Sequence, residues 1–526
     1  RERVFVSGSV LSYAWLLGDK PIYKGDEKGR EFAGALYGDK LGGKRNVRYN
    51  MEVLRASGDD FSVWGASHDA LLKVGVYSRV DGYDAAYGAD FSLVVPGGTG
   101  GSIVGYGRGA TGSRVFFDTV YGNFSMGYQE GVETALKVDV LNSLPGAGNG
   151  SWGRHIMRFL KYSDAAPFHV YPGLYSENLF RSMAWKDASK DPFSVRFKDV
   201  VTTIPLRLSY VSKDINGFQF GVSYAVAGYR DDLFKGGDFQ TSNVVSKIDS
   251  LDDQKAENPN VIAVRAISLG EPRFDLGPVY KNVLGAALRY ELLSDDVKVA
   301  LSFAIEHGDA KKHDKLSVSS TMSEGKFFIE YDELAAYSVG MEALYSGILK
   351  VGFNYGYLGK SGRPKTFTGR DSHGYIVRNV PYLNYRPSYY FASSLGYLWG
   401  SFSASVMCFV SKVGYTAPAA VASEPDLFSE LKIVKEGGSK SEEFKSLFDG
   451  ENVLTDFVLG FGYDMYRKGR ANVQMFMNCH VFSSSQKFNV HKYLGVEDKS
   501  KQFEHVATHK NGYEGVMAFG GLKFTF

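Results

Sequence analysis

The sequence predicts an all-β fold, a closed antiparallel transmembrane β-barrel of about sixteen strands. Three observations support this prediction. The 526 residues include 61 Gly, 34 Tyr and 37 Phe but only 15 Pro and 2 Cys, a composition that favours strands over helices. Extended segments alternate apolar and polar residues with a period of two. Short turns alternate with connections of tens of residues, as in barrels that have short turns on one side of a membrane and long loops on the other.

Sixteen segments carry the alternating pattern that predicts a strand. In chain order they are 3–17, 70–79, 85–95, 112–119, 123–130, 202–212, 217–228, 281–293, 296–306, 334–345, 347–358, 388–398, 400–410, 453–463, 470–482 and 514–526. The segment 296–306 shows the pattern clearly, because Leu301 and Phe303 fall on one face and Ser302 falls on the other. Three further strand-like segments, 46–57, 260–269 and 325–331, are assigned to hairpins within loops. Eighteen strands is therefore the alternative count, and residues 1–526 are expected to form a single domain.

The C-terminal segment "GVMAFGGLKFTF" predicts a final strand that closes the wall. Its residues Leu522, Phe524 and Phe526 share one face, while Lys523 and Thr525 share the other. Lipid leaves no unpaired backbone edge, so the last strand is expected to pair with the first. The apolar face is then directed to hydrocarbon and the polar face to the barrel interior.

Charge and hydropathy exclude several classes of protein. The formal net charge is +2 and there is no long run of Lys or Arg, so no nucleic-acid partner is expected. No stretch reaches the roughly 18 to 20 apolar residues of a transmembrane helix. The sequence starts at Arg1 without a signal peptide, which fits a mature exported chain and equally a cytosolic one. Cys408 and Cys479 fit neither a disulfide framework nor a metal motif and are interpreted as small apolar residues.

A soluble β-sandwich or propeller is the alternative fold, since its strands also alternate but direct their apolar face into a core. Aromatic residues gather at the ends of predicted strands, as in "PSYYFASSLGYLWG" at 387–400. Such grouping is typical of the aromatic girdles at membrane interfaces. No repeat of fixed period indicates propeller blades. The aromatic placement and the loop asymmetry therefore favour the membrane barrel.

Two stretches resemble the general (diffusion) porins of Gram-negative bacteria, particularly those of the alphaproteobacterial type. They are "SRVFFDTVYGNFSMGYQEGVETALKVD" at 113–139 and "TTIPLRLSYVSKDINGFQFGVSYA" at 202–225, together with the C-terminal strand. The resemblance implies a homotrimer in the cell outer membrane, exported through the periplasm and in contact with outer-membrane lipids and lipopolysaccharide or an equivalent. It also implies a third loop folded into the lumen, and passive diffusion of small hydrophilic solutes and ions through a water-filled channel. The terminal aromatic residue matches the signal for outer-membrane assembly that the resemblance implies.

The predicted constriction lies in the connection between residues 131 and 201, whose first part, 133–158, is expected inside the barrel. A channel discriminates by its width and by fixed charges that project into it. The loop candidates for the pore constriction are Glu133, Asp139, Arg154 and Arg158, and strand phase directs the wall candidates Lys73, Arg79, Arg114 and Arg207 into the lumen. The hypothesis is a transverse field in which Glu133 and Asp139 face the basic wall. The alternative for each residue is an ordinary solvated side chain.

Two motifs suggest chemistry but lack the required context. The G-x-G-x-x-G match at 107–112 is followed by a strand pattern and not by the helix that a dinucleotide site needs. His505 and His509 lie four residues apart in "HVATH", but the Glu of a zinc-protease motif is missing. We therefore predict no enzyme, with no catalytic residue, no metal and no cofactor. The alternatives to a channel are a surface adhesin or antigen with a loop-plugged lumen and, third, an outer-membrane hydrolase.

Short helices are expected in the long loops. The segment 175–187 has Ser176 as a candidate N-cap. The segment 423–448 has apolar residues at helical spacing in two runs, which predict two short amphipathic helices. The runs consist of Leu427, Phe428, Leu431 and Val434, and of Phe444, Leu447 and Phe448. These helices are expected to form a lid or a surface for a host or partner molecule.

Overall fold

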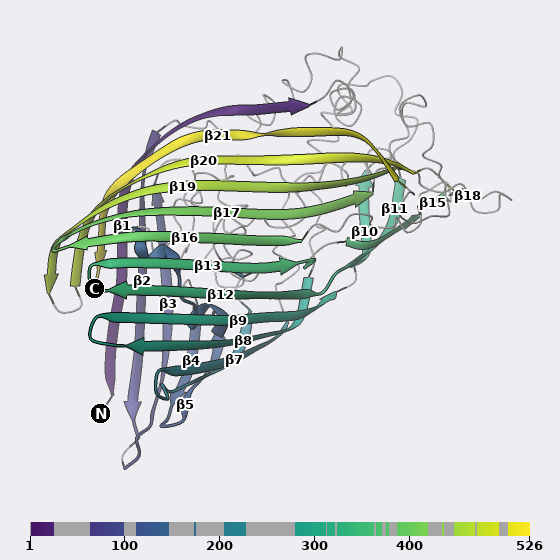
Figure 1. The fold of residues 1–526 in the computed structure, drawn as a ribbon. Coiled ribbons are helices and arrows are strands. Elements are labelled where there is room, and N and C mark those ends of the chain that lie inside the picture. The colour runs from purple at the N-terminus through teal and green to yellow at the C-terminus, as the bar shows by residue number, and fades with distance from the viewer. Residues whose placement is uncertain are drawn as a thin grey trace.

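Sixteen strands form one closed antiparallel barrel (Figure 1). The computed structural model describes residues 2–25, 64–80, 82–98, 112–146, 173–174, 205–227, 279–311, 313–320, 323–361, 364–370, 375–377, 387–418, 434–435, 446–468, 471–493 and 503–526, and the strand count refers to these ranges. A second sheet of five strands lies at the end of the barrel opposite the two chain termini (Figure 1). The termini and the short turns share one end, called here the short-turn end. The opposite end is the long-connection end.

The barrel strands follow one another around the wall in chain order. They are β1 (Arg3–Gly25), β2 (Trp64–Arg79), β3 (Ala86–Gly98), β4 (Gly112–Asp118), β5 (Gly122–Tyr128), β6 (Leu206–Ser212), β7 (Phe218–Ala227), β8 (Val279–Leu293), β9 (Val297–Lys311), β12 (Leu334–Tyr345), β13 (Leu349–Gly359), β16 (Ser388–Trp399), β17 (Phe402–Pro418), β19 (Ser446–Lys468), β20 (Ala471–Tyr493) and β21 (Phe503–Thr525). The second sheet contains β10 (His313–Ser320), β11 (Ser323–Tyr331), β14 (Pro364–Arg370), β15 (Tyr375–Val377) and β18 (Val434–Lys435).

All sixteen predicted strands are confirmed, and the described barrel has sixteen strands, not the alternative eighteen. The strand-like segment 325–331 falls in β11, which pairs with β10 and β14 outside the barrel. The segments 46–57 and 260–269 lie outside the described residues. Alternation of side chains is therefore a dependable guide to the wall strands of this chain.

The first and last strands close the barrel, as predicted. β1 pairs with β21 from Ser9 opposite Thr525 to Gly25 opposite His509. Beyond this ladder Gly8 N donates to Phe526 O at 2.9 Å and Phe526 N donates to Gly8 O at 3.1 Å. A Cβ at Gly8 would clash with Leu71 O of β2 and lie 2.9 Å from the Phe526 ring, so the close approach of the neighbouring strands requires glycine here.

The outer face is an apolar band between two rows of aromatic residues. At the short-turn side Tyr345 is followed, two strands further along the wall, by Tyr397. On the long-connection side Tyr337 lies opposite Tyr357 with their rings 5.3 Å apart, and Tyr357 lies opposite Tyr389. Between the rows most outward side chains of these strands are apolar, and the exposed ones include Val339, Met341, Val351 and Leu395. The alternation thus places the apolar face outside, as the sequence predicts.

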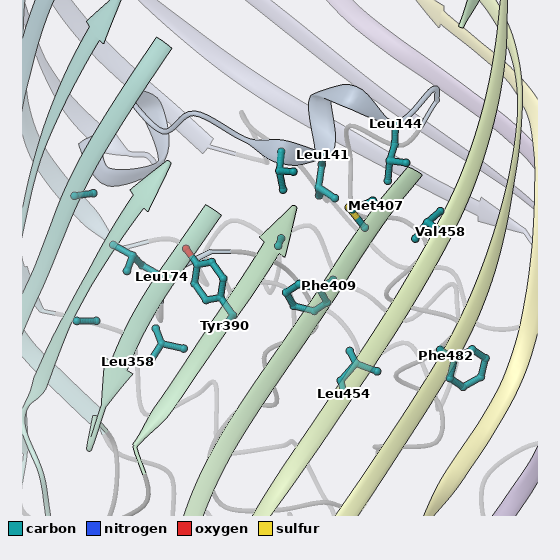
Figure 2. Packing of buried hydrophobic residues seen from close by; sticks show 14 of the residues in the cluster. Leu141, Leu144, Leu174, Leu358, Tyr390, Met407, Phe409, Leu454, Val458 and Phe482 are labelled. Atoms are coloured by element: carbon teal, nitrogen blue, oxygen red, sulfur yellow. The ribbon is translucent and has the colours of Figure 1, made fainter. Parts of the chain in front are cut away.

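The inner face has two chemically different halves. The half near the short turns carries most of the charged side chains, namely Lys73, Asp90, Arg114, Arg289, Glu291, Lys298, Glu342, Lys350 and Lys523. The half near the long connections carries buried apolar side chains, of which Figure 2 labels Met407, Phe409, Leu454, Val458 and Phe482. The same cluster includes Tyr13, Trp15, Met517 and Phe519. The alternation predicts inward residues that are small or polar, with Phe476 as an exception. The long-connection half differs because its side chains form one cluster with Leu141 and Leu144 of the inward loop.

Two expectations about helices are wrong at the residues that the structure describes, and the remaining predicted helix residues Leu427, Phe428, Leu431 and Phe444 lie outside the described ranges. Leu447 and Phe448, expected on a helix, lie in β19, which extends to Ser446, and Val434 lies in β18. The ladder partners that β17 and β20 provide to β19 override the local helical spacing. The predicted helix at 175–187 lies outside the described residues. No helix in the described ranges is long and apolar enough to cross a membrane.

Candidate functional site

The chain after β5 turns into the barrel and follows the inner wall. Residues 129–146 form the described part of this loop, called here the inner loop, with a one-turn helix α3 (Val132–Ala135) and a 3-10 turn η1 (Val140–Ser143). The inner loop contacts the inner faces of β6 to β9, then those of β12, β13 and β16, and finally those of β19 and β20. It therefore lies along about half of the wall, and the inner faces of β21 and β1 to β4 lie on the other side.

Glycines on the inner wall make room for the inner loop. A Cβ at Gly340 would lie 2.6 Å from Val138 O, and one at Gly352 would lie 3.1 Å from the Val140 side chain. A Cβ at Gly462 would lie 2.6 Å from the Pro145 ring. Because the loop backbone passes this close, larger residues at these positions would push it from the wall.

Polar side chains of the wall bind the backbone of the inner loop. The Asn354 side chain makes two hydrogen bonds to the loop backbone: its Nδ2 donates to Val138 O at 2.6 Å, and its Oδ1 accepts from Val140 N at 2.7 Å. Ser302 Oγ accepts from Val138 N at 2.9 Å. At the far end of the loop Gln474 Oε1 accepts from Gly146 N at 2.8 Å. The wall thus holds the loop through its backbone, so the path of the loop depends little on the loop's own side chains.

A buried ion pair fixes the start of the inner loop. Arg207 Nη1 of β6 lies 3.2 Å from Glu133 Oε1, and the two side chains are 0 % and 1 % exposed. Ser223 Oγ of β7 accepts from Arg207 Nη1 at 3.2 Å and lies 3.5 Å from Glu133 Oε2. Two of the predicted site residues are therefore in direct contact, but neither faces open lumen.

Asp139, the second acidic loop candidate, is directed to its own loop. Its Oδ1 accepts from Leu141 N at 3.0 Å, which caps η1. Its Oδ2 lies 3.9 Å from Lys137 Nζ, and both side chains are nearly buried. The structure does not place Asp139 against the basic wall residues that the sequence analysis named.

Three charged residues form a cluster on the opposite wall. Arg114 Nε of β4 donates a hydrogen bond to both carboxylate oxygens of Asp90 of β3, at 3.2 Å to Oδ1 and 3.1 Å to Oδ2. Lys73 Nζ of β2 lies 3.5 Å from Asp90 Oδ2. Asp90 is 6 % exposed, whereas Lys73 and Arg114 are each 32 % exposed. This basic wall cluster, defined as Lys73, Asp90 and Arg114, presents two cations to the lumen. Asp90 was missed, although its inward strand phase opposite Arg114 could have identified it.

The other predicted site residues are placed as follows. Arg79 is the last residue of β2 and is exposed at the short-turn end, away from the inner loop. Arg154 and Arg158 lie outside the described residues. His505 and His509 lie in β21, so they are not on the helix face that the zinc motif requires.

Gly340→Ala should destabilise the fold by about 1–3 kcal/mol, because the new Cβ would displace the Asn354 amide and Ser302 hydroxyl from a buried backbone. Gly396→Ala is the matched control on the same inner wall, where the Cβ would meet nothing closer than 3.6 Å. Urea unfolding in detergent micelles, followed by tryptophan fluorescence, measures both variants. Equal midpoints would contradict the close approach at Gly340.

The fold and the inner loop define a class of protein, a closed β-barrel whose lumen is partly occupied by a segment of its own chain. No protein-family model matches the chain, and no curated protein matches it. Among solved structures, the chain is similar to a multiply substituted porin of Rhodopseudomonas blastica (10% identity, TM-score 0.38, 100% of both chains covered). It is also similar to an anion-selective porin from Comamonas acidovorans (10% identity, TM-score 0.31, 99% of this chain and 100% of the other covered).

Proposed function

We propose that this chain is an outer-membrane channel for passive diffusion of small hydrophilic solutes and ions. The observation that carries the proposal is the partial exposure of Lys73 and Arg114 inside the closed wall, across the lumen from the inner loop. Charged side chains that stay accessible within a barrel require water beside them, since a dry carboxylate or ammonium is costly. An apolar outer band and a wet, charged inner wall together suit a channel in a membrane.

Current through planar lipid bilayers tests the proposal. Step-like openings of the purified protein at steady voltage are the expected result. Silence from protein that is folded and inserted would contradict it and would favour the adhesin or antigen reading, in which the lumen is plugged. The inner loop would set the constriction, and the channel reading assigns no catalytic step to any residue.

Arg114→Glu should shift the cation-to-anion permeability ratio toward cations by about thirtyfold at low salt. At about 8 Å in water one unit charge contributes about 0.5 kcal/mol to the energy of a passing ion, so reversing it lowers the energy of a cation by about 1 kcal/mol and raises that of an anion by about 1 kcal/mol. The reversal potential in a salt gradient measures the shift, which should shrink at high salt. Lys412→Glu is the matched control, because Lys412 lies on the outer face beside Glu451 at 2.7 Å. Equal reversal potentials for the Arg114 variant and the unmodified protein would contradict the placement of Arg114 at the constriction.

The outer face near the barrel seam supports the proposed homotrimer. Ser12 Oγ of β1 lies 2.6 Å from His68 Nδ1 of β2, and both side chains point outward. Ala14, Ala66 and Gly520 next to them on the outer face are small, while Leu522 lies opposite Ser12 on β21. A polar pair beside small residues is poorly suited to hydrocarbon and well suited to a protein neighbour. Analytical ultracentrifugation in detergent tests the assembly, and a monomer in mild detergent would count against it.

A further inference from the structure

The apolar half of the inner wall contains an isolated acidic group. Asp456 of β19 points inward and is 0 % exposed, as are its neighbours Leu454 and Val458 on the same face. Across the ladder it lies opposite Phe409 of β17 and Phe482 of β20. Figure 2 shows these four apolar side chains on neighbouring strands, on one side of the sheet. A carboxylate in such surroundings is costly unless every oxygen atom has a partner.

One oxygen of Asp456 is satisfied and the other is not. Asp456 Oδ2 lies 2.8 Å from His480 Nδ1 of β20, and the His480 ring is stacked on Phe519 with centroids 5.3 Å apart. The imidazole N–H is the donor, because a carboxylate only accepts. Asp456 Oδ1 has no hydrogen-bond partner in the described part of the chain.

A second polar atom without a partner lies close to the first. Ser411 of β17 is 0 % exposed, and its Oγ makes no hydrogen bond to any described residue. Ser411 is opposite Leu454 in the ladder, which places it diagonally across from Asp456 at about 7–8 Å between Cα atoms. The carboxylate oxygen and the hydroxyl are therefore within reach of one small head group.

We propose that Asp456 and Ser411 form a lumen site for a small amphipathic amine, with the ammonium group on Asp456 Oδ1 and Ser411 Oγ and the apolar body against Phe409, Leu454 and Phe482. An ammonium group supplies both missing donors and opposes the carboxylate charge. An aromatic body matches the apolar side chains around them. The site goes beyond passive diffusion, and it depends on the inner wall but not on conduction.

Isothermal titration of the full chain in detergent with phenethylamine tests the site. Saturable binding to one site per chain is expected, and Asp456→Asn should weaken it by at least about tenfold. Ser411→Ala should weaken it by a smaller factor, since one neutral hydrogen bond is lost. Ethylamine should bind much more weakly because it lacks the apolar body, and phenethyl alcohol because it lacks the charge.

Glu342→Gln is the matched control for the acidic residue. Glu342 lies on the inner wall in the polar half, 3.0 Å from Lys350, and its loss should leave phenethylamine affinity unchanged. Heat-modifiable mobility on gels shows whether each variant folds, and Ser411→Ala carries the test if Asp456→Asn does not fold. Absence of phenethylamine binding, equal affinity in the Asp456 variant, or equal affinity for the alcohol would overturn the proposal. Because titration needs no current, its failure would be distinct from failure of the channel function.

Discussion

Arg207→Met is expected to destabilise the protein by about 3–5 kcal/mol, because it leaves the Glu133 carboxylate buried without its cation. Arg207 and Glu133 are 0 % and 1 % exposed, so water cannot replace the lost partner without movement of the inner loop. Two outcomes follow from this arrangement. The urea midpoint should fall, and single-channel current should become noisier, since the start of the loop is no longer attached to β6. Urea titration of the protein in detergent micelles and bilayer recordings measure the two effects.

The double variant Glu133→Gln with Arg207→Met distinguishes the cost of one unpaired buried charge from the net contribution of the ion pair to stability. Removing both charges should recover much of the lost stability, because a buried pair contributes little beyond satisfying its own members. Lys350→Met is the matched single control. Its partner Glu342 lies 3.0 Å away but both side chains keep contact with solvent, so the loss should be about 1 kcal/mol or less. If Arg207→Met cost no more than Lys350→Met, the buried attachment of the loop would be refuted.

The wall strands could be predicted from the sequence because each must direct apolar side chains outward over its whole length. In β9 the outward Leu301 and Phe303 alternate with the inward Ser302, an order that fits an extended strand and does not fit a helix. Closure by β21 could be predicted for the same reason, since an open edge has no partner in lipid. A period of two does not indicate which strands pair across a long connection. In this barrel, strands that follow one another in the chain are also neighbours in the wall.

The contacts of the inner loop could not be predicted, because they join residues far apart in the chain. Val138 meets Asn354 through a side-chain amide, 216 positions away. Inward phase places Asn354 and Gly340 in the lumen, but only the register between β12 and β13 brings them to one spot. The same limit applies to the charged residues. Strand phase correctly directs Arg207 inward, but its ion pair with Glu133 depends on the path of the loop, which the sequence does not reveal.

The apolar half of the inner wall also could not be predicted from the alternating pattern. Phe476 breaks the alternation of its strand, and the structure explains this residue: Gly146 of the loop lies against its ring, and Phe519 packs edge-on at 5.8 Å. An inward aromatic residue thus marks a position where another part of the chain fills the lumen. The helical spacing around Leu447 gave a wrong prediction, because pairing with the neighbouring strand β20 makes this short segment a strand despite its local spacing.

Met341→Arg is expected to destabilise the barrel in a bilayer by about 2–4 kcal/mol, the cost of a cation near the membrane midplane. Met341 faces outward on β12 and is 38 % exposed. It lies four residues from both Tyr337 and Tyr345, which belong to the two aromatic rows. In the proposed membrane location the band between those rows meets hydrocarbon, so its centre should be least tolerant of charge.

Tyr345→Arg is the matched control at the edge of the same strand. Tyr345 is 57 % exposed at the short-turn end, where an arginine reaches the interface and should cost about 0–1 kcal/mol. Urea titration of folding into lipid vesicles measures both variants, and the same pair in detergent micelles should differ less, because a micelle adapts around the charge. Equal costs in vesicles would mean that the exposed face of β12 does not cross hydrocarbon, and they would contradict the proposed membrane location of the barrel.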